Sequence, residues 1–131
     1  MISSIDLAWA AGLIEGEGCF GLSSGWAANH SSPVVCAVQK DPEVLLRLQR
    51  MFGGTMRRHR GAPSVTHQWR CFGVHAAGLA MTIYGFMSRK RRSEITRMLS
   101  RWRSRKAAPG MVFNRIERQR NPAFIPHGTA T

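Results

Sequence analysis

The chain has 131 residues, enough for one domain with a substantial hydrophobic core. Its formal net charge is +12, because 19 lysines and arginines outweigh 7 acidic residues. This balance favours a polyanionic partner, with nucleic acid ahead of a membrane surface. The longest mainly apolar run, residues 74–87, is too short to span a bilayer, and residues 1–16 lack the basic start of a signal peptide. The composition thus argues against membrane-spanning and secreted proteins.

The first predicted element is a helix over residues 4–16. Ser3 and Asp6 at its start have the spacing of a capping box, and Gly16 and Gly18 interrupt it at the other end. The helix therefore ends where two carboxylates stand between glycines.

One flank of this helix carries almost no side-chain bulk. Ala8, Gly12 and Gly16 recur along it every four residues, and Ala11 lies beside them. Glycine costs about 1 kcal/mol relative to alanine inside a helix, so Gly12 needs a packing reason. Because flanks of this spacing let two helix backbones approach closely, we expect a helix-helix contact here.

Two carboxylates, Glu15 and Glu17, fall at the C-terminal end of the helix, where the helix dipole disfavours negative charge. A divalent cation would offset that charge, and the glycines beside Glu17 leave backbone carbonyls approachable. Exposed glutamates at a glycine-rich helix end explain the same residues without a metal. The spacing alone leaves both interpretations open.

Two strands and a second helix are predicted next. Alternation in residues 19–26 indicates a strand with one buried face, and the apolar run 34–39 indicates a central strand after a turn at 29–33. Residues 41–43, Asp-Pro-Glu, start a helix that the glycine pair at 53–54 stops. Its predicted core positions are Val44, Leu45, Leu48 and Phe52, whereas Arg47 and Arg50 are predicted to face away.

A basic hairpin is predicted from strands at 55–60 and 64–72 around a turn at 61–63. This pairing makes one sheet face polar and basic, and a DNA major groove admits a two-stranded ribbon. An ordinary solvated face explains the same pattern. The side chains predicted on this face are Thr55, Arg57, His59, Thr66, Gln68 and Arg70.

Two helices are predicted to complete the domain. Residues 75–87 form a mainly apolar helix with Leu79, Ile83 and Phe86 in the core, and Ser88 caps a last helix. The apolar stripe of that helix is Ile95, Met98, Leu99 and Trp102. Its other faces carry Arg89, Lys90, Arg91, Arg92, Arg97, Arg101, Arg103, Arg105 and Lys106, a density of charge that solubility does not require.

Helical periodicity fails beyond residue 106. We therefore expect a single domain over residues 1–106 and a basic, flexible tail over residues 107–131. Cys19, Cys36 and Cys71 are isolated, odd in number and without metal-ligand spacing, and the histidines are scattered. These patterns favour a reduced intracellular chain with buried thiols and argue against a zinc site.

The predicted order of elements is α-β-β-α-β-β-α-α, and residues 10–18 read AAGLIEGEG. This stretch resembles the motif of the LAGLIDADG homing endonuclease family, with glutamate in place of both aspartates. Five of its nine positions are identical, namely Ala11, Gly12, Leu13, Ile14 and Gly18. Weaker similarities follow in the same order at residues 38–41, 53–54 and 86–91. The resemblance implies an α+β fold with a curved antiparallel DNA-binding sheet over about residues 4–106.

The resemblance also implies metal-dependent hydrolysis of DNA phosphodiester bonds. Glu17 matches the acid that binds the divalent metal, Mg²⁺ or another divalent cation such as Mn²⁺, and the Gly16 carbonyl matches a backbone metal contact. Gln39 resembles the residue that positions the attacking water network, and Lys90 resembles the basic residue near the scissile phosphate. Glu15 matches an acid that is usually structural.

One acid per chain serves one strand, so cutting both strands implies a homodimer. Its predicted interface contains Ala8, Ala11 and Gly12, and its two sheets would read a long, near-palindromic double-stranded DNA site. The predicted DNA-binding side chains are Arg57, His59, Gln68, Arg70, Arg89 and Arg91.

Three functions remain open on the sequence. The first is a site-specific DNA endonuclease located wherever its target DNA resides, which the presence of Glu17, Gln39 and Lys90 together favours. The second is a non-catalytic nucleic-acid-binding protein on the same scaffold, either an intron maturase that binds RNA or a DNA-binding regulator. The third is a basic structural or ribosome-associated protein without sequence preference.

Overall fold

The structure of the chain is a computed structural model that describes residues 1–23, 31–60 and 65–106. Its elements, in chain order, are α1 (Ser4–Glu17), β1 (Gly18–Leu22), β2 (Pro33–Gln39), α2 (Pro42–Phe52), β3 (Thr55–Arg60), β4 (Val65–Phe72), α3 (Gly73–Ile83), the short 3₁₀ helix η2 (Tyr84–Phe86) and α4 (Arg89–Lys106). The predicted order is confirmed. The predicted tail, the turn at 61–63, residues 29 and 30 of the turn at 29–33, and residues 24–26 of the predicted first strand lie outside the described residues.

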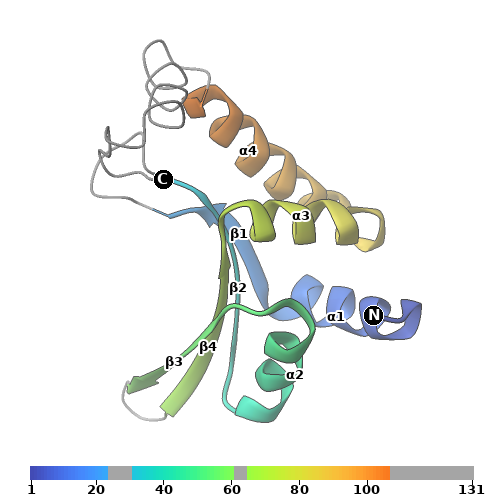
Figure 1. The fold of residues 1–131 in the computed structure, drawn as a ribbon, viewed down its shortest axis with the longest axis vertical. Helices are drawn as coiled ribbons and strands as arrows, with labels where there is room; N and C mark the ends of the chain where they lie inside the picture. The colour runs from blue at the N-terminus through green and yellow to red at the C-terminus, as the bar shows by residue number, and fades with distance from the viewer. Residues whose placement is uncertain (24–30, 61–64, 107–131) are drawn as a thin grey trace, which may run out of the picture.

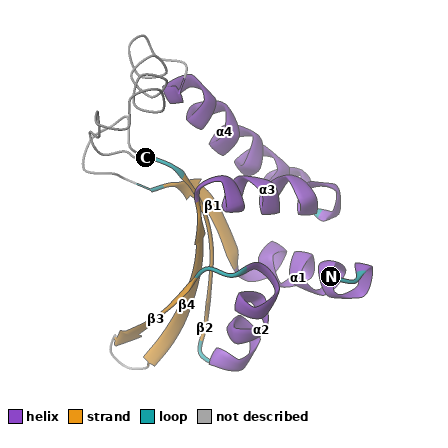
Figure 2. Cartoon of the chain, in the orientation of Figure 1, coloured by secondary structure: helices purple, strands orange, loops and turns teal. Residues whose placement is uncertain are grey.

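The four strands form one antiparallel sheet in the order β1-β2-β4-β3. The apolar strand β2 lies between β1 and β4, as its composition predicts. The helices lie on one side of the strands (Figures 1 and 2), so the sheet has a helix-covered inner face and an opposite face, which we call the outer face. None of the described helices combines the length and apolarity needed to cross a membrane.

The core lies between the inner face and the helices. Val35 and Ala37 of β2 and Trp69 and Cys71 of β4 point into it, because they alternate with residues of the outer face. The indole Nε1 of Trp69 donates to the carbonyl of Gly53 at 2.7 Å. The helices add apolar side chains that are almost fully buried, including Ile14, Leu45, Leu48, Ile83, Ile95 and Met98.

The helix starts confirm the capping signals in the sequence. Ser3 accepts a hydrogen bond from the Asp6 backbone N–H at 3.0 Å and caps α1. Asp41 accepts from the Glu43 N–H at 2.9 Å and caps α2, with proline in the first turn. Helix α2 ends at two glycines with positive φ, and a Cβ on Gly54 (φ 95°) would collide with the backbone of β4.

Two predicted side-chain placements are wrong. Phe86 is 54% exposed rather than buried, because α3 ends at Ile83 and the chain continues as a 3₁₀ turn that rotates Phe86 away from the core. Arg47 does not face away. Its guanidinium pairs with Asp6 at 2.9 Å and stacks over Trp9, 3.9 Å from the ring centroid, so it joins α2 to α1.

Candidate functional site

The last residue of α1, Glu17, is exposed, and Gly18 begins β1 directly after it. Gly18 pairs with Ala37, so Gln39 at the end of β2 lies at the same end of the β1-β2 pair as Glu17. Gln39 is half-buried and alternates with the outward-facing Val38, which places it on the side of the inner face. Two residues that lie 22 positions apart in sequence are thereby brought to one edge of the sheet.

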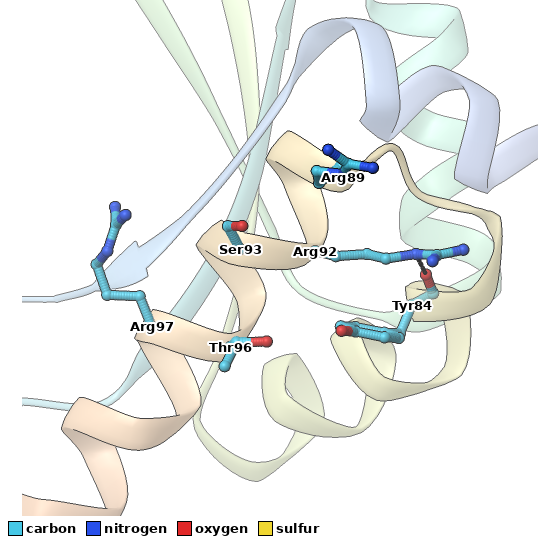
Figure 3. Close-up of a pocket in the computed structure, with 6 residues that line it drawn as sticks. All are labelled: Tyr84, Arg89, Arg92, Ser93, Thr96 and Arg97. Carbon is cyan, nitrogen blue, oxygen red and sulfur yellow. Dashed lines mark hydrogen bonds between the residues drawn. The ribbon is translucent and has the colours of Figure 1, made fainter.

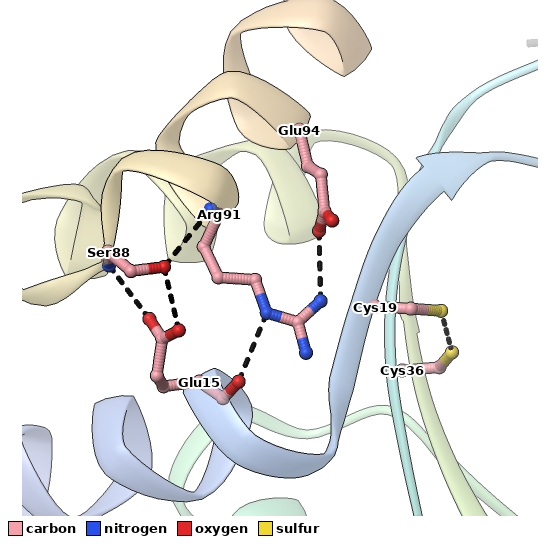
Figure 4. A network of polar contacts seen from close by, with 6 residues as sticks. All are labelled: Glu15, Cys19, Cys36, Ser88, Arg91 and Glu94. Carbon is pink, nitrogen blue, oxygen red and sulfur yellow. Dashed lines mark hydrogen bonds and ion pairs between the residues drawn. The ribbon is translucent and has the colours of Figure 1, made fainter.

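Glu15 joins the end of α1 to the start of α4 (Figure 4). Its carboxylate accepts hydrogen bonds from the backbone N–H and the hydroxyl of Ser88, each at 2.8 Å. The same hydroxyl accepts from the Arg91 N–H at 3.3 Å, so Ser88 also caps α4 as predicted. We call this Glu15-Ser88 contact the clamp. It places the acid at the positive end of α4, which explains a carboxylate that α1 alone disfavours.

The clamp also changes the pKa of Glu15. The pKa of the Glu15 carboxyl is lowered, first by the Ser88 backbone N–H, then by the Ser88 hydroxyl, and further by the charges of Arg91 and Lys90. Lys90, an exposed residue two positions after Ser88, is therefore close enough to act on Glu15. Of the three predicted catalytic residues, Glu17 and Gln39 lie at one end of the β1-β2 pair, and Lys90 lies near Glu15 at the start of α4.

Arg91, a predicted DNA-binding residue, makes contacts within its own chain. Its Nε donates to the Glu15 carbonyl at 3.0 Å, and its Nη1 pairs with Glu94 at 2.9 Å. The side chain is only 15% exposed. Two protein oxygens thus hold the guanidinium on the protein side of α4, and the DNA contact of Arg91 stays a prediction.

A cation at this edge would meet few protein ligands from one chain. The described residues contain no cluster of three or more histidine, cysteine or acidic side chains that could hold a metal ion. The oxygen donors are the Glu17 carboxylate and carbonyls of the last turn of α1, such as that of Gly16, which lack an intrahelical donor. Hard cations such as Mg²⁺ prefer such oxygens but bind through few protein ligands plus phosphate and water. The donor set therefore fits a cation that also takes ligands from outside the chain, such as phosphate and water.

The outer face carries the predicted polar hairpin in the predicted register. Thr55 pairs with Arg70, Arg57 with Gln68, and His59 with Thr66. A ring nitrogen of His59 lies 3.2 Å from the Gln68 Oε1. These four predicted DNA-binding residues, Arg57, His59, Gln68 and Arg70, thus share one surface, where the Arg70 guanidinium stacks 4.8 Å from the Phe72 ring centroid.

The small-residue flank of α1 divides into an exposed and a buried part. Ala8 and Gly12 are exposed, and a Cβ added to Gly12 would meet nothing within 4 Å. Ala11 is 2% exposed and belongs to the core, because it lies about 100° around the helix from Gly12 and faces the sheet. Ala11 therefore packs within its own chain, and its role in an interface stays a prediction. Ile5, 78% exposed, extends the flank, a feature the sequence reading missed.

A basic pocket of about 380 Å³ lies between η2 and the first turns of α4 (Figure 3). The Arg92 side chain is fixed there by hydrogen bonds to the carbonyls of Tyr84 and Gly85, at 3.2 and 3.0 Å. Arg89, predicted to bind DNA, and Arg97 also line the pocket. Phosphate-sized anions fit this chemistry.

Cys19 and Cys36 are isolated from each other in the sequence but lie side by side in the structure. They are direct partners in the β1-β2 register, and their sulfur atoms lie 2.7 Å apart. The pKa of Cys19 is lowered to about 6, first by the hydrogen bond with Cys36 and then by nearby arginines, whereas the pKa of Cys36 is raised by the same hydrogen bond and by burial. The expectation of buried thiols holds for Cys36 and Cys71, but Cys19 is exposed.

No protein-family model matches the chain. A curated relative, "Probable intron-encoded endonuclease aI2" of Debaryomyces hansenii, is 33% identical over 60 residues, which are 46% of this chain and 9% of that protein. The chain thus matches only a small part of its relative's length. The homing endonuclease I-TnaI superposes with a TM-score of 0.61 at 16% identity, covering 94% of this chain and 89% of that one. The LAGLIDADG meganuclease I-AabMI, bound to uncleaved DNA, gives 0.54 at 16% identity over 89% and 39% of the chains.

The chain has the LAGLIDADG homing endonuclease fold. The α+β class and the element order expected from residues 10–18 are thereby confirmed. In this LAGLIDADG fold the motif helix α1 supplies three different surfaces. Ala11 and Ile14 face the core, Glu15 forms the clamp, and Gly12 and Glu17 remain exposed.

Replacing Glu15 by alanine is expected to lower the melting temperature at pH 7 by several degrees, because the clamp loses both hydrogen bonds to Ser88. The folded-state pKa of Glu15 lies below the reference value of 4.5, so the carboxylate stabilises the fold above pH 4.5 and loses that effect as the pH falls through its folded-state pKa. The difference between wild type and Glu15→Ala should therefore shrink in acid. Thermal denaturation from pH 3 to 7 measures it.

The control for this prediction is a double-mutant cycle with Ser88→Ala. If the clamp couples α1 to α4, the double variant should lose less stability than the sum of the two single variants. Additive losses, or a wild-type difference that is constant with pH, would contradict the assignment.

Proposed function

We propose that this chain is a site-specific DNA endonuclease that hydrolyses both strands of double-stranded DNA as a homodimer with a divalent cation, Mg²⁺ or Mn²⁺. The observation that carries the proposal is that Glu17 and Gln39 share one sheet edge, in a chain whose outer face is basic and whose Lys90 lies near Glu15. The name of the curated relative, an intron-encoded endonuclease, supports the same class of reaction.

Glu17, Gln39 and Lys90 each have a proposed role that their position allows. Glu17, exposed at the end of α1, would hold the cation together with carbonyls such as that of Gly16. The bound cation supplies a Lewis acid that offsets charge on the phosphate and lowers the pKa of a bound water. The Gln39 amide would orient the water by hydrogen bonding, and the Lys90 ammonium would add positive charge near the phosphate.

DNA is the proposed partner of the outer face. Arg57, Gln68 and Arg70 stand on adjacent antiparallel strands, whose width suits the major groove. I-AabMI, which shares the fold, is bound to DNA in its structure. Arginine and glutamine side chains form bidentate hydrogen bonds with guanine and adenine respectively, so this surface is suited to reading sequence.

The homodimer is proposed from the exposed flank of α1. Ile5, Ala8 and Gly12 form an apolar strip without bulk at its centre, and α1 of a second chain would bury it. Two-fold symmetry would then bring two Glu17 carboxylates together, each completing the half site that one chain offers. A near-palindromic target follows from the same symmetry.

The test is cleavage of a randomised double-stranded DNA library by the purified chain, with sequencing of the cut ends. Both strands should be cut at one long, near-palindromic sequence in Mg²⁺, and cutting should stop in EDTA and resume when Mg²⁺ or Mn²⁺ is restored. Sequence-selective binding without cutting would instead support the non-catalytic maturase or regulator. Binding without any sequence preference would refute both.

A further inference from the structure

We propose that Cys19 and Cys36 form an oxidisable dithiol, which a low-molecular-weight disulfide such as oxidised glutathione converts into an intrachain disulfide. This modification site does not depend on the proposed nuclease activity. It lies on the β1-β2 pair, next to the strand ends that lead to Glu17 and Gln39.

The backbone places the two residues where a disulfide is allowed. Cys19 and Cys36 are register partners in antiparallel strands, and directly opposed residues have Cα atoms about 4.5 to 5.5 Å apart, within the range that disulfides span. Their sulfur atoms are already in contact at 2.7 Å, so side-chain directions as well as backbone spacing match. Closing the bond requires no exchange of strand partners.

The surroundings favour reaction at this pair and not at the third cysteine. Cys19 is exposed, so a soluble disulfide can reach its sulfur atom. Disulfide exchange requires such access to the attacking sulfur. Cys71 is 2% exposed and points into the core from β4, so an oxidant cannot reach it in the folded chain.

The reaction balances in two exchange steps. The Cys19 thiol gives up its proton, and its sulfur attacks one sulfur of oxidised glutathione, which forms a mixed disulfide and releases one glutathione that takes up the proton. Cys36 then loses its proton and attacks the Cys19 sulfur, which releases the second glutathione. The two cysteines together lose two electrons, and the glutathione disulfide gains them.

The location links this chemistry to the outer face. Cys36 pairs with Arg70 across β2 and β4 and lies beside the Gln68 side chain. A disulfide here would fix β1 to β2 next to the side chains proposed to read DNA. Oxidation state would therefore change the covalent structure of that surface without adding any group to it.

The test treats the folded, reduced chain with oxidised glutathione, then alkylates it in denaturant and maps the peptides by mass spectrometry. Free thiols should fall from three to one, and the new link should join Cys19 to Cys36. The same treatment of the unfolded chain should give a mixture of the three possible pairings. A mixture in the folded chain, three remaining thiols, or disulfide-linked chains on a non-reducing gel would overturn the proposal.

Matched variants distinguish disulfide formation between Cys19 and Cys36 from the reaction of any exposed thiol. Cys71→Ala should still form the Cys19-Cys36 link, whereas Cys36→Ser should form none and should stop at the mixed disulfide on Cys19. If Cys36→Ser does not fold, Cys19→Ser replaces the exposed member and should leave both remaining thiols unreacted. Formation of a Cys19-Cys71 link in the folded Cys36→Ser variant would contradict the geometry.

Discussion

Replacing Glu17 by glutamine is expected to abolish DNA cleavage while leaving folding, DNA binding and dimerisation largely unchanged. The exchange removes the one carboxylate at the end of α1 that is exposed and free of the clamp, and hard cations bind an amide oxygen much less well. Losing a partner that merely orients a metal ligand costs about 10- to 100-fold in activity, so losing the ligand itself should cost at least about 100-fold. Single-turnover cleavage in Mg²⁺ measures the loss.

The matched control for Glu17 is Glu43→Gln, which makes the same exchange at another exposed carboxylate, at the start of α2. It should cleave like wild type. Undiminished cleavage by Glu17→Gln would exclude Glu17 as the metal ligand. Loss of DNA binding in the same variant would instead indicate that Glu17 is needed to form the DNA-binding surface.

Replacing Gly12 by leucine is expected to prevent dimerisation and to leave a folded monomer. Gly12 is exposed and an added Cβ meets nothing within 4 Å in the isolated chain, so we expect a larger side chain to be tolerated within one molecule. Leucine is a good helix former, whereas glycine costs about 0.8 to 1 kcal/mol relative to alanine, so the monomer should melt slightly higher. In a helix pair packed at Gly12, by contrast, the two leucines would collide and hold the backbones apart. Sedimentation at several concentrations would detect the change.

The control for Gly12 is Gly78→Leu. Gly78 is a glycine within α3 that likewise has no neighbour within 4 Å of an added Cβ. The Gly78→Leu variant gains the same helix propensity at a position outside the α1 flank. It should therefore dimerise with the same affinity as wild type. A Gly12→Leu dimer of wild-type affinity would refute the helix-pair interface, and an unfolded variant would refute the open space around Gly12.

Local signals in the sequence predicted the fold well because each acts within a few residues. The Ser3 and Asp41 caps, the proline after Asp41 and the Gly53-Gly54 stop all operate within one helix turn. The alternation of the β3-β4 hairpin likewise fixed which side chains share the outer face, and its register agrees with the pairs expected. In this part of the chain, local chemistry and tertiary packing point the same way.

The features that the sequence did not reveal concern side chains whose contacts depend on a distant segment. Arg91 resembles its basic neighbours in sequence, but the Glu15 carbonyl that holds it is 76 residues away. Ala11 and Gly12 are both small, and only the position of the sheet decides which of them is buried. Cys19 and Cys36 are paired by strand register, which the spacing of the cysteines alone does not reveal.

The resemblance to a motif named Glu17, Gln39 and Lys90, but their spacing along the chain does not show how they are arranged in space. Antiparallel pairing of β1 with β2 brings Glu17 and Gln39 to one sheet edge. The contact between Glu15 and Ser88 holds the start of α4, which carries Lys90, against the end of α1. The fold therefore supplied positions that the motif alone could not.

The clamp has a mechanical consequence. Ser88 is two residues before Lys90, and Glu15 is two residues before Glu17. The two hydrogen bonds between Ser88 and Glu15 therefore connect the segment that carries the lysine to the segment that carries the acid. If a bound polyanion shifted α4, these two hydrogen bonds would transmit part of the shift to the last turn of α1. The position of the start of α4 and the position of the Glu17 carboxylate are thus coupled through Glu15 and Ser88.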